Sequence, residues 1–149
     1  MNLTRLVYVS AATRPFTSVE LRQLLEKARA YNSRAEITGL LLYHQQSFFQ
    51  ILEGMDENLD ELYERIDHDP RHHDVLLLSR QSVNERNFGE WSMGFVDVDD
   101  AAKKLPGFKR LLQAKSSFLD LHGDTHLTAK LVDGFQKGLW HQSVESGKK

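Results

Sequence analysis

The stretch "SFFQILEG", from Ser47 to Gly54, is the most informative part of the sequence for predicting the fold. Between Phe48 and Leu52 every residue is apolar except Gln50, and a short apolar run bounded by polar residues and glycine predicts a strand. Because side chains alternate across a strand, Phe48, Gln50 and Leu52 share one face, and Phe49, Ile51 and Glu53 share the other. Both faces are largely apolar, which predicts a central strand covered on both sides. A buried amide without partners costs about 1–3 kcal/mol, so Gln50 needs an explanation.

Strands and helices alternate on either side of this stretch. Strands are expected at Leu3–Ser10, Glu36–Tyr43, Ser47–Glu53, Val75–Val83 and Trp91–Val96, which are rich in apolar and β-branched residues. A helix is expected between the capping box Thr17–Glu20 and Asn32. A second helix, capped by Asp56 or Asn58, must end before Pro70. Two more helices are expected near Lys104–Leu121 and Asp124–Trp140.

The order of these elements is β-α-β-β-α-β-β, followed by α-α. It predicts an α+β fold of the ferredoxin-like βαββαβ type, with the first and third strands central and both helices on one sheet face. A fifth strand is added, and the two C-terminal helices are the expected cover for the other face.

The composition excludes several classes of function. The chain of 149 residues has a net charge of −2, with 40% hydrophobic and 27% charged residues. This balance argues against a general nucleic-acid or membrane binder. The absence of cysteine excludes disulfides, thiolate metal sites and thiol catalysis. With no signal peptide at "MNLTRLVYVS" and no membrane-spanning run, we expect a cytoplasmic protein.

A second polar residue, Tyr8, lies on the apolar pattern of the first strand, in phase with Leu6 and Ser10. Two readings remain open at this point. Tyr8 and Gln50 either satisfy each other as polar residues of the core, as buried polar groups usually do, or line a pocket and present hydrogen-bond donors to a flat polar ligand.

Several motifs, in their order and spacing, resemble those of the BLUF domain, a blue-light sensor that uses flavin. The matching segments extend from Leu3 to about Val96: "LVYVS", "AYN", "ITGLLLY", "SFFQILEG", "DPRHHDV" and "FGEWSMGF". The resemblance implies a flavin-binding sensor domain over residues 1–97. Residues 98–140 would form a helical cap or output segment, and 141–149 a disordered tail.

The resemblance also implies a site. Tyr8 and Gln50 would lie at the polar edge of the flavin ring, with Ser10 beside them and Asn32 on the pyrimidine edge. Asp69, Arg71 and His72 would lie near the ribityl-phosphate end, where arginine suits phosphate. Trp91 and Met93 have the same parity in the expected fifth strand, so both could face Gln50. FAD is the cofactor expected, with FMN or riboflavin as substitutes.

The mechanism implied by the resemblance is an electron transfer from Tyr8 to the light-excited flavin, with the proton following through Gln50. A rotated or tautomerised Gln50 would then leave a reversible, red-shifted state. Because turning an amide exchanges a donor for an acceptor, Gln50 is interpreted as a two-state switch. The implied protein is a sensor rather than an enzyme, acting on a separate partner protein or through a homo-oligomer, without direct contact to nucleic acid or membrane.

Simpler interpretations compete with this one. The fold alone hosts many activities, so a small-ligand or nucleotide-binding module without photochemistry is the alternative. A hydrolase of the acylphosphatase type could use Arg14, but no glycine-rich loop accompanies it. Trp91 and Met93 can be ordinary packing residues, Arg71 a solvated side chain and Asn32 a helix end. The i, i+4 pairs His68/His72 and His122/His126 lack the further ligands that a structural zinc site needs, so no metal is expected.

Overall fold

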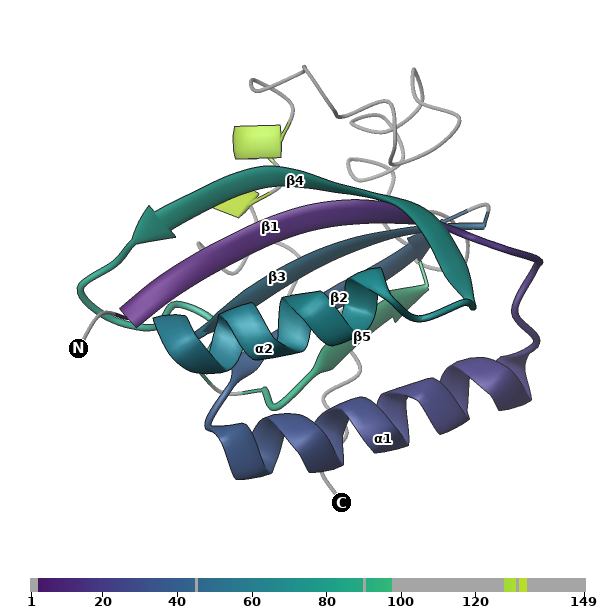
Figure 1. Cartoon of the computed structure of the whole chain (residues 1–149), viewed down its shortest axis with the longest axis horizontal. Coiled ribbons are helices and arrows are strands. Elements are labelled where there is room, and N and C mark those ends of the chain that lie inside the picture. Colours follow the sequence, from purple (N-terminus) through teal and green to yellow (C-terminus); the bar gives the residue numbers. More distant parts are fainter. Residues whose placement is uncertain (1–2, 45, 90, 98–127, 131, 134–149) are drawn as a thin grey trace.

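Five strands form one sheet, and two helices lie side by side on one of its faces (Figure 1). The computed structural model describes residues 3–44, 46–89, 91–97, 128–130 and 132–133. The elements are β1 (Leu3–Ala12), α1 (Ser18–Ala35), β2 (Thr38–His44), β3 (Ser47–Met55), α2 (Asp56–Asp67), β4 (His72–Ser82) and β5 (Gly94–Asp97).

The strand order β4-β1-β3-β2-β5 places β1 and β3 at the centre, as the sequence predicts. β1 pairs antiparallel with both β3 and β4, and β3 pairs antiparallel with β2. β5 adds to the free edge of β2 in the parallel direction. The ferredoxin-like prediction with an added fifth strand is therefore confirmed.

Both faces of the sheet are buried, which agrees with the apolar pattern of "SFFQILEG". On the helix side, α1 and α2 pack on a cluster that includes Leu6, Tyr8, Leu41, Phe48 and Leu52. The opposite face is equally dry, with exposed fractions of 2% or less for Val7, Val9, Leu40, Leu42, Phe49 and Ile51. The alternation across β3 thus places Gln50 on the side of the helices.

The β2–β3 hairpin depends on a glycine. A Cβ at Gly39 would lie 2.1 Å from the carbonyl oxygen of Ile51, which no side chain tolerates. The backbone N–H of Gly39 donates to the carbonyl of Trp91 at 3.0 Å. Gly39 therefore lets the hairpin and the segment before β5 approach each other closely.

The predicted capping box of α1 is present, with Thr17 and Glu20 each accepting a hydrogen bond from the other's backbone N–H. The helix continues to Ala35, past the predicted end near Asn32, and closes at Glu36 in the left-handed conformation (φ 57°). The prediction that Asp56 or Asn58 caps α2 is wrong. Met55 occupies the N-cap without a side-chain bond, Asp56 accepts from the Thr4 hydroxyl, and Asn58 donates to the carbonyl of Ala35.

Strand boundaries also differ from the sequence prediction, most of all at the starts of β4 and β5. β4 begins at His72 rather than Val75, because His72 and His73 already pair with Ala12 and Ala11. β5 begins at Gly94 rather than Trp91, because side chains of α1 hold the carbonyls of Ser92 and Met93.

The predicted C-terminal elements lie almost wholly outside the described residues. This applies to the helix Lys104–Leu121, to most of the cap 98–140 and to the tail 141–149. Within the predicted helix Asp124–Trp140, residues 128–130 and 132–133 are described and are helical. Figure 1 shows them on the side of the sheet away from α1 and α2.

Candidate functional site

A pocket of about 650 Å³ lies between α1 and α2, above the sheet. Strands contribute Tyr8, Ser10, Leu41, Phe48, Gln50 and His72; the helices contribute Leu24, Lys27, Ala28, Tyr31, Asn32, Leu62, Arg65 and Ile66; connecting segments contribute Phe16, Asp69, Pro70, Arg71 and Met93. A volume in this range and mostly apolar walls with a few polar groups are typical of small-molecule sites.

Tyr8, Gln50 and Met93 form a chain of polar contacts in the pocket wall. Tyr8 and Gln50 are directly paired between β1 and β3. The Tyr8 hydroxyl donates to Oε1 of Gln50, and Nε2 of Gln50 donates to the sulfur of Met93 at 3.4 Å. The three exposed fractions are 2%, 7% and 1%. Tyr8 and Gln50 therefore satisfy each other's hydrogen bonds, and both also line a pocket. The two alternatives left open by the sequence are compatible.

The Tyr8 phenol is held in its neutral form. Burial raises the pKa of Tyr8 far above its ordinary value, and the nearby Tyr63 and Asp69 raise it further. The Tyr63 ring contacts Tyr8 edge-on, with centroids 5.6 Å apart. Tyr8 thus keeps its proton for donation to Gln50.

Asn32 ties α1 to the segment before β5. Its side chain is 1% exposed, and its Nδ2 donates to the carbonyl of Ser92 at 2.7 Å. One turn earlier, Nε of Arg29 donates to the carbonyl of Met93 at 2.9 Å. The Asn32 amide has a second N–H and an oxygen with which it can meet a ligand.

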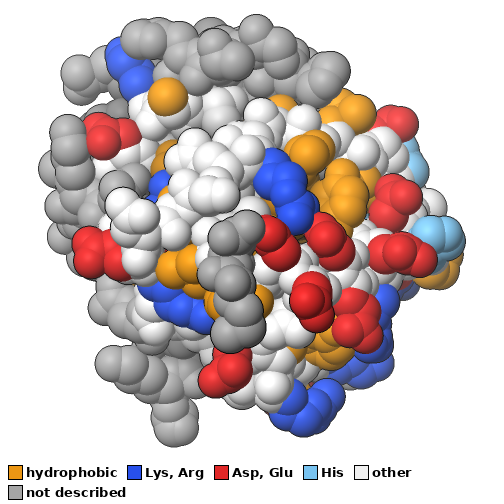
Figure 2. Space-filling view, turned by 60° about the vertical axis from the view of Figure 1, so that its left-hand side comes forward, with side chains coloured by type: hydrophobic (Ala, Val, Ile, Leu, Met, Phe, Trp, Pro, Cys, Tyr) orange, Lys and Arg blue, Asp and Glu red, His pale blue; other side chains and the backbone are white. Residues whose placement is uncertain are grey.

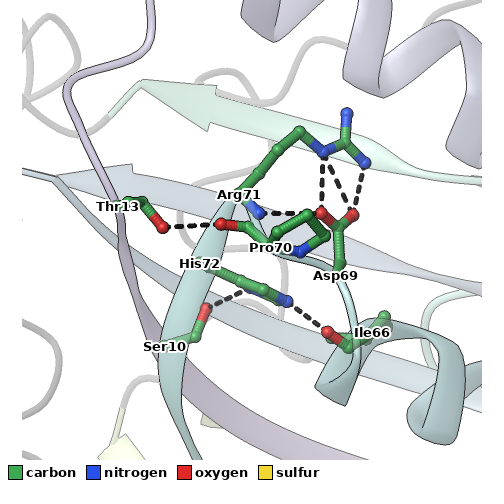
Figure 3. A network of polar contacts seen from close by, with 7 residues as sticks. All are labelled: Ser10, Thr13, Ile66, Asp69, Pro70, Arg71 and His72. Carbon is green, nitrogen blue, oxygen red and sulfur yellow. Dashed lines mark hydrogen bonds and ion pairs between the residues drawn. The ribbon is translucent and has the colours of Figure 1, made fainter.

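A second polar network closes the pocket at the end of α2 (Figure 3). His72 Nδ1 lies 3.0 Å from the Ser10 hydroxyl, and its Nε2 contacts the carbonyl of Ile66. Arg71 Nε donates to both carboxylate oxygens of Asp69, at 3.0 and 3.1 Å. The Arg71 guanidinium holds the pKa of Asp69 below its usual range, although partial burial acts against this.

Trp91 does not line the pocket with Met93. Its ring packs at 6.5 Å from Phe88, and the Phe88 ring lies 5.8 Å from the guanidinium of Arg5, which belongs to the other sheet face. The two residues precede β5, so the strand parity that grouped them does not apply. Met93 lines the pocket and accepts a hydrogen bond from Gln50.

Apart from Asn32, the helix residues of the pocket were not predicted as site residues from the sequence. Lys27 and Tyr31 are one turn apart on α1, and Arg65 of α2 places its guanidinium 4.6 Å from the centre of the Tyr31 ring. The signal in the sequence was the i, i+4 spacing of Lys27, Tyr31 and of Leu62, Ile66, which places these pairs on the pocket-facing side of each helix.

Residues 3–94 match the family described as "BLUF: Sensors of blue-light using FAD". The chain belongs to the BLUF family. It is 37% identical over 112 residues to the photoactivated adenylate cyclase subunit alpha of Euglena gracilis, covering 74% of this chain and 11% of that protein. It is 31% identical to the blue light- and temperature-regulated antirepressor BluF of Escherichia coli K12, covering 64% of this chain and 24% of that protein.

Among solved structures, the dark state of the BLUF protein BlrB is similar. It superposes with a TM-score of 0.76 at 30% identity, covering 92% of this chain and 97% of BlrB. The BLUF chain is thus a blue-light sensor domain that binds flavin. This domain spans only about a tenth of the length of the cyclase subunit that it matches.

The residues around the pocket of this BLUF domain fit a flavin. Apolar side chains from both helices can cover the two faces of a flat ring, and the amides of Asn32 and Gln50 can meet its polar edges. The described part of the chain holds no group of three or more His, Cys, Asp or Glu that could bind a metal ion. None of its described helices is long and apolar enough to cross a membrane.

Proposed function

We propose that this BLUF domain detects blue light through the pair Tyr8 and Gln50, and passes the change on through Met93. The observation that carries the proposal is the hydrogen bond from the Tyr8 hydroxyl to Gln50 Oε1 in the wall of the pocket. When bound, flavin supplies the absorption of blue light and, once excited, a strong one-electron oxidant.

Tyr8 is the electron donor of the proposal, and Gln50 is the proton relay. The phenol contacts a single amide oxygen in a dry wall, so a proton that leaves Tyr8 has Gln50 as its nearest acceptor. At its other end the amide meets only a thioether, which is a weak acceptor. This contact therefore opposes rotation of Gln50 only weakly, and either rotation or tautomerisation would alter what this side chain offers to the pocket.

Further residues of the pocket hold the cofactor in this proposal. Asn32 binds the buried ring edge, and Ser10 and His72 border the ring beside Tyr8. The positive charges for a phosphate are Arg71, which Asp69 already pairs, together with Lys27 and Arg65. FAD is the proposed form, and FMN or riboflavin share the ring and ribityl chain on which these contacts depend.

The output is proposed to be a contact with another protein rather than a reaction. The related Escherichia coli protein is named an antirepressor, which suggests a separate partner for this sensor as well. A homo-oligomer remains the other proposed route. Acidic and basic side chains are mixed on the face shown in Figure 2, and α2 exposes Glu57, Asp60, Glu61 and Glu64, which does not suit a nucleic acid.

The test is the absorption spectrum of the purified, flavin-loaded protein before and after blue light. We expect a small red shift that reverses in the dark. Tyr8→Phe and Gln50→Leu should each keep the fold and the flavin but lose the normal shift, because one lacks the phenolic proton and the other the amide. Normal photoconversion in either variant would contradict the assigned role. A protein that binds flavin without any shift would be the non-photochemical binding module instead.

A further inference from the structure

Tyr63 contacts the photoactive Tyr8 and lies nearer to the surface of the molecule. Its ring lies on α2, with its centroid 5.6 Å from that of Tyr8 and its plane turned by 79°. Tyr8 is buried, whereas Tyr63 is only partly buried. The two phenols therefore form a short path from the pocket wall to water. The proposed switch of Tyr8 and Gln50 does not need this path.

The electrostatic surroundings distinguish Tyr63 from Tyr31, the other partly buried tyrosine. The chain has four, all of them in the described residues. Tyr31 lies 4.6 Å from the Arg65 guanidinium, and a positive charge at this distance opposes removal of an electron from the ring. Tyr43 packs among Phe16 and Phe48. Near Tyr63, by contrast, the negative charge of Asp67 favours an electron-deficient ring.

The proton also favours Tyr63 as the place for a radical. A neutral tyrosine radical forms when the ring loses an electron and its hydroxyl loses a proton. The Tyr8 hydroxyl is enclosed and bonded to Gln50, so its proton stays within the site. The Tyr63 side chain is partly open to solvent, so water can take its proton.

We infer that Tyr63 is a second redox-active tyrosine, which reduces an oxidised Tyr8 and moves the radical to the edge of the molecule. One electron passes from the Tyr63 ring to the Tyr8 ring. The proton held at Gln50 returns to the Tyr8 oxygen and restores its O–H bond, while the Tyr63 O–H bond breaks and its proton goes to water. The inference rests on the proposed function, since the light-excited flavin is the oxidant of Tyr8.

This electron transfer is a non-productive side reaction of the photocycle. Once Tyr63 has reduced Tyr8, the electron that the flavin accepted can no longer return to Tyr8, and the flavin stays reduced. It competes with the productive cycle, so Tyr63→Phe should yield more red-shifted protein per absorbed photon.

The experiment traps the radical where it is exposed. Flavin-loaded protein is illuminated with a water-soluble nitroso spin trap, and adducts are located by mass spectrometry of peptides. We expect a light-dependent adduct on Tyr63 in the wild type and in Tyr43→Phe, a matched control on β2 outside the pocket lining. In Tyr8→Phe the adduct on Tyr63 should fall to the level of a dark sample, while Tyr63→Phe should keep the normal red shift.

Two results would overturn the inference. One is an unchanged adduct on Tyr63 in Tyr8→Phe, which would mean direct oxidation of Tyr63. The other is a wild-type protein that shows the normal red shift but no adduct on Tyr63. A wild type without the red shift would instead refute the proposed function, so the two failures are distinguishable.

Discussion

Gln50 meets a strong donor at one end of its amide and a weak acceptor at the other. The Tyr8 hydroxyl fixes Oε1, whereas Nε2 has only the sulfur of Met93, at 3.4 Å. A residue buried to 7% exposure would ordinarily need two good partners to be stable there. The weak contact at Nε2 leaves this N–H available to a ligand or to a rearrangement, which explains an amide in an otherwise apolar strand.

At Asn32 and Arg71 the same reasoning predicts unequal effects on flavin binding. Asn32→Ala should raise the Kd for flavin by roughly tenfold or more, because losing a buried hydrogen bond costs about 1–3 kcal/mol and 1.4 kcal/mol is tenfold. Arg71→Ala should raise the Kd less than about fivefold, because an exposed ion pair contributes at most about 1 kcal/mol. Arg71 is moreover already occupied by Asp69. Flavin titrations of the two variants make the comparison, and a larger loss for Arg71→Ala would place the main anchor at the phosphate.

Buried charges on the sheet face opposite the pocket bind the loop before β5 to the sheet. The carboxylate of Glu53 is fully buried and lies 2.9 Å from the Arg5 guanidinium. It also accepts from the backbone N–H groups of Asn87 and Phe88, at 2.9 and 2.8 Å. Arg86 donates from the same loop to the carbonyls of Glu53 and Glu36. β3 therefore carries the switch residue and the anchor of this loop three residues apart.

Glu53→Gln should lower the free energy of unfolding by about 3–5 kcal/mol, since removing one partner leaves a buried charge uncompensated. The double variant Arg5→Met, Glu53→Gln should recover part of this loss, because the orphaned charge is gone. Urea denaturation of both variants is the measurement. The exposed pair Arg14–Glu20 is the matched control, and Arg14→Gln should cost much less, because solvent screens an exposed ion pair. Equal losses in Glu53→Gln and Arg14→Gln would contradict the role given to the buried pair.

The first turn of α1 should respond to acid through Glu20. A hydrogen bond from Arg14, followed by one from the Thr17 backbone, lowers the pKa of Glu20 from 4.5 to about 2. Because the folded pKa lies below the unfolded value, the contribution is complete above pH 4.5 and is lost as the pH falls toward 2. An NMR titration of the Glu20 carboxyl group should show the low pKa, and Arg14→Gln should raise it. An unchanged pKa in that variant would assign the shift to the capping box alone.

For the whole molecule, the sequence predicted the architecture better than the details of the site. The period-2 pattern of β3 and the capping box of α1 depend on local residues, so both could be predicted. The resemblance of motifs predicted one site for Tyr8, Gln50 and Asn32, and all three line the same pocket. The separation of Trp91 from Met93 could not be foreseen, because it follows from contacts of Gly39, Arg29 and Asn32 that only the folded chain makes. The pairing of Arg71 with Asp69 was likewise invisible.

Residues 87–89 and 91–93 contact both the pocket side and the opposite side of the sheet. Met93 contacts Gln50, Ser92 and Met93 are held by α1, and Asn87 and Phe88 are held by Glu53. A changed Gln50 must alter the partner of the Met93 sulfur, and each of these contacts lies within a few residues of that sulfur. The first turn of α1 is closed by its own capping box and shares none of them.

We therefore predict that light changes amide hydrogen exchange in residues 87–96 more than in the first turn of α1. The informative amides are those of Asn87, Phe88 and Trp91, whose hydrogen bonds to Glu53 and to the Phe88 carbonyl would weaken as the segment shifts. Exchange in dark and lit states is compared by mass spectrometry, with Gln50→Leu as the control in which the difference should vanish. If residues 87–96 exchange identically in both states of a protein with a normal red shift, the signal leaves the pocket by another route, of which α2, through Tyr63, is the nearest.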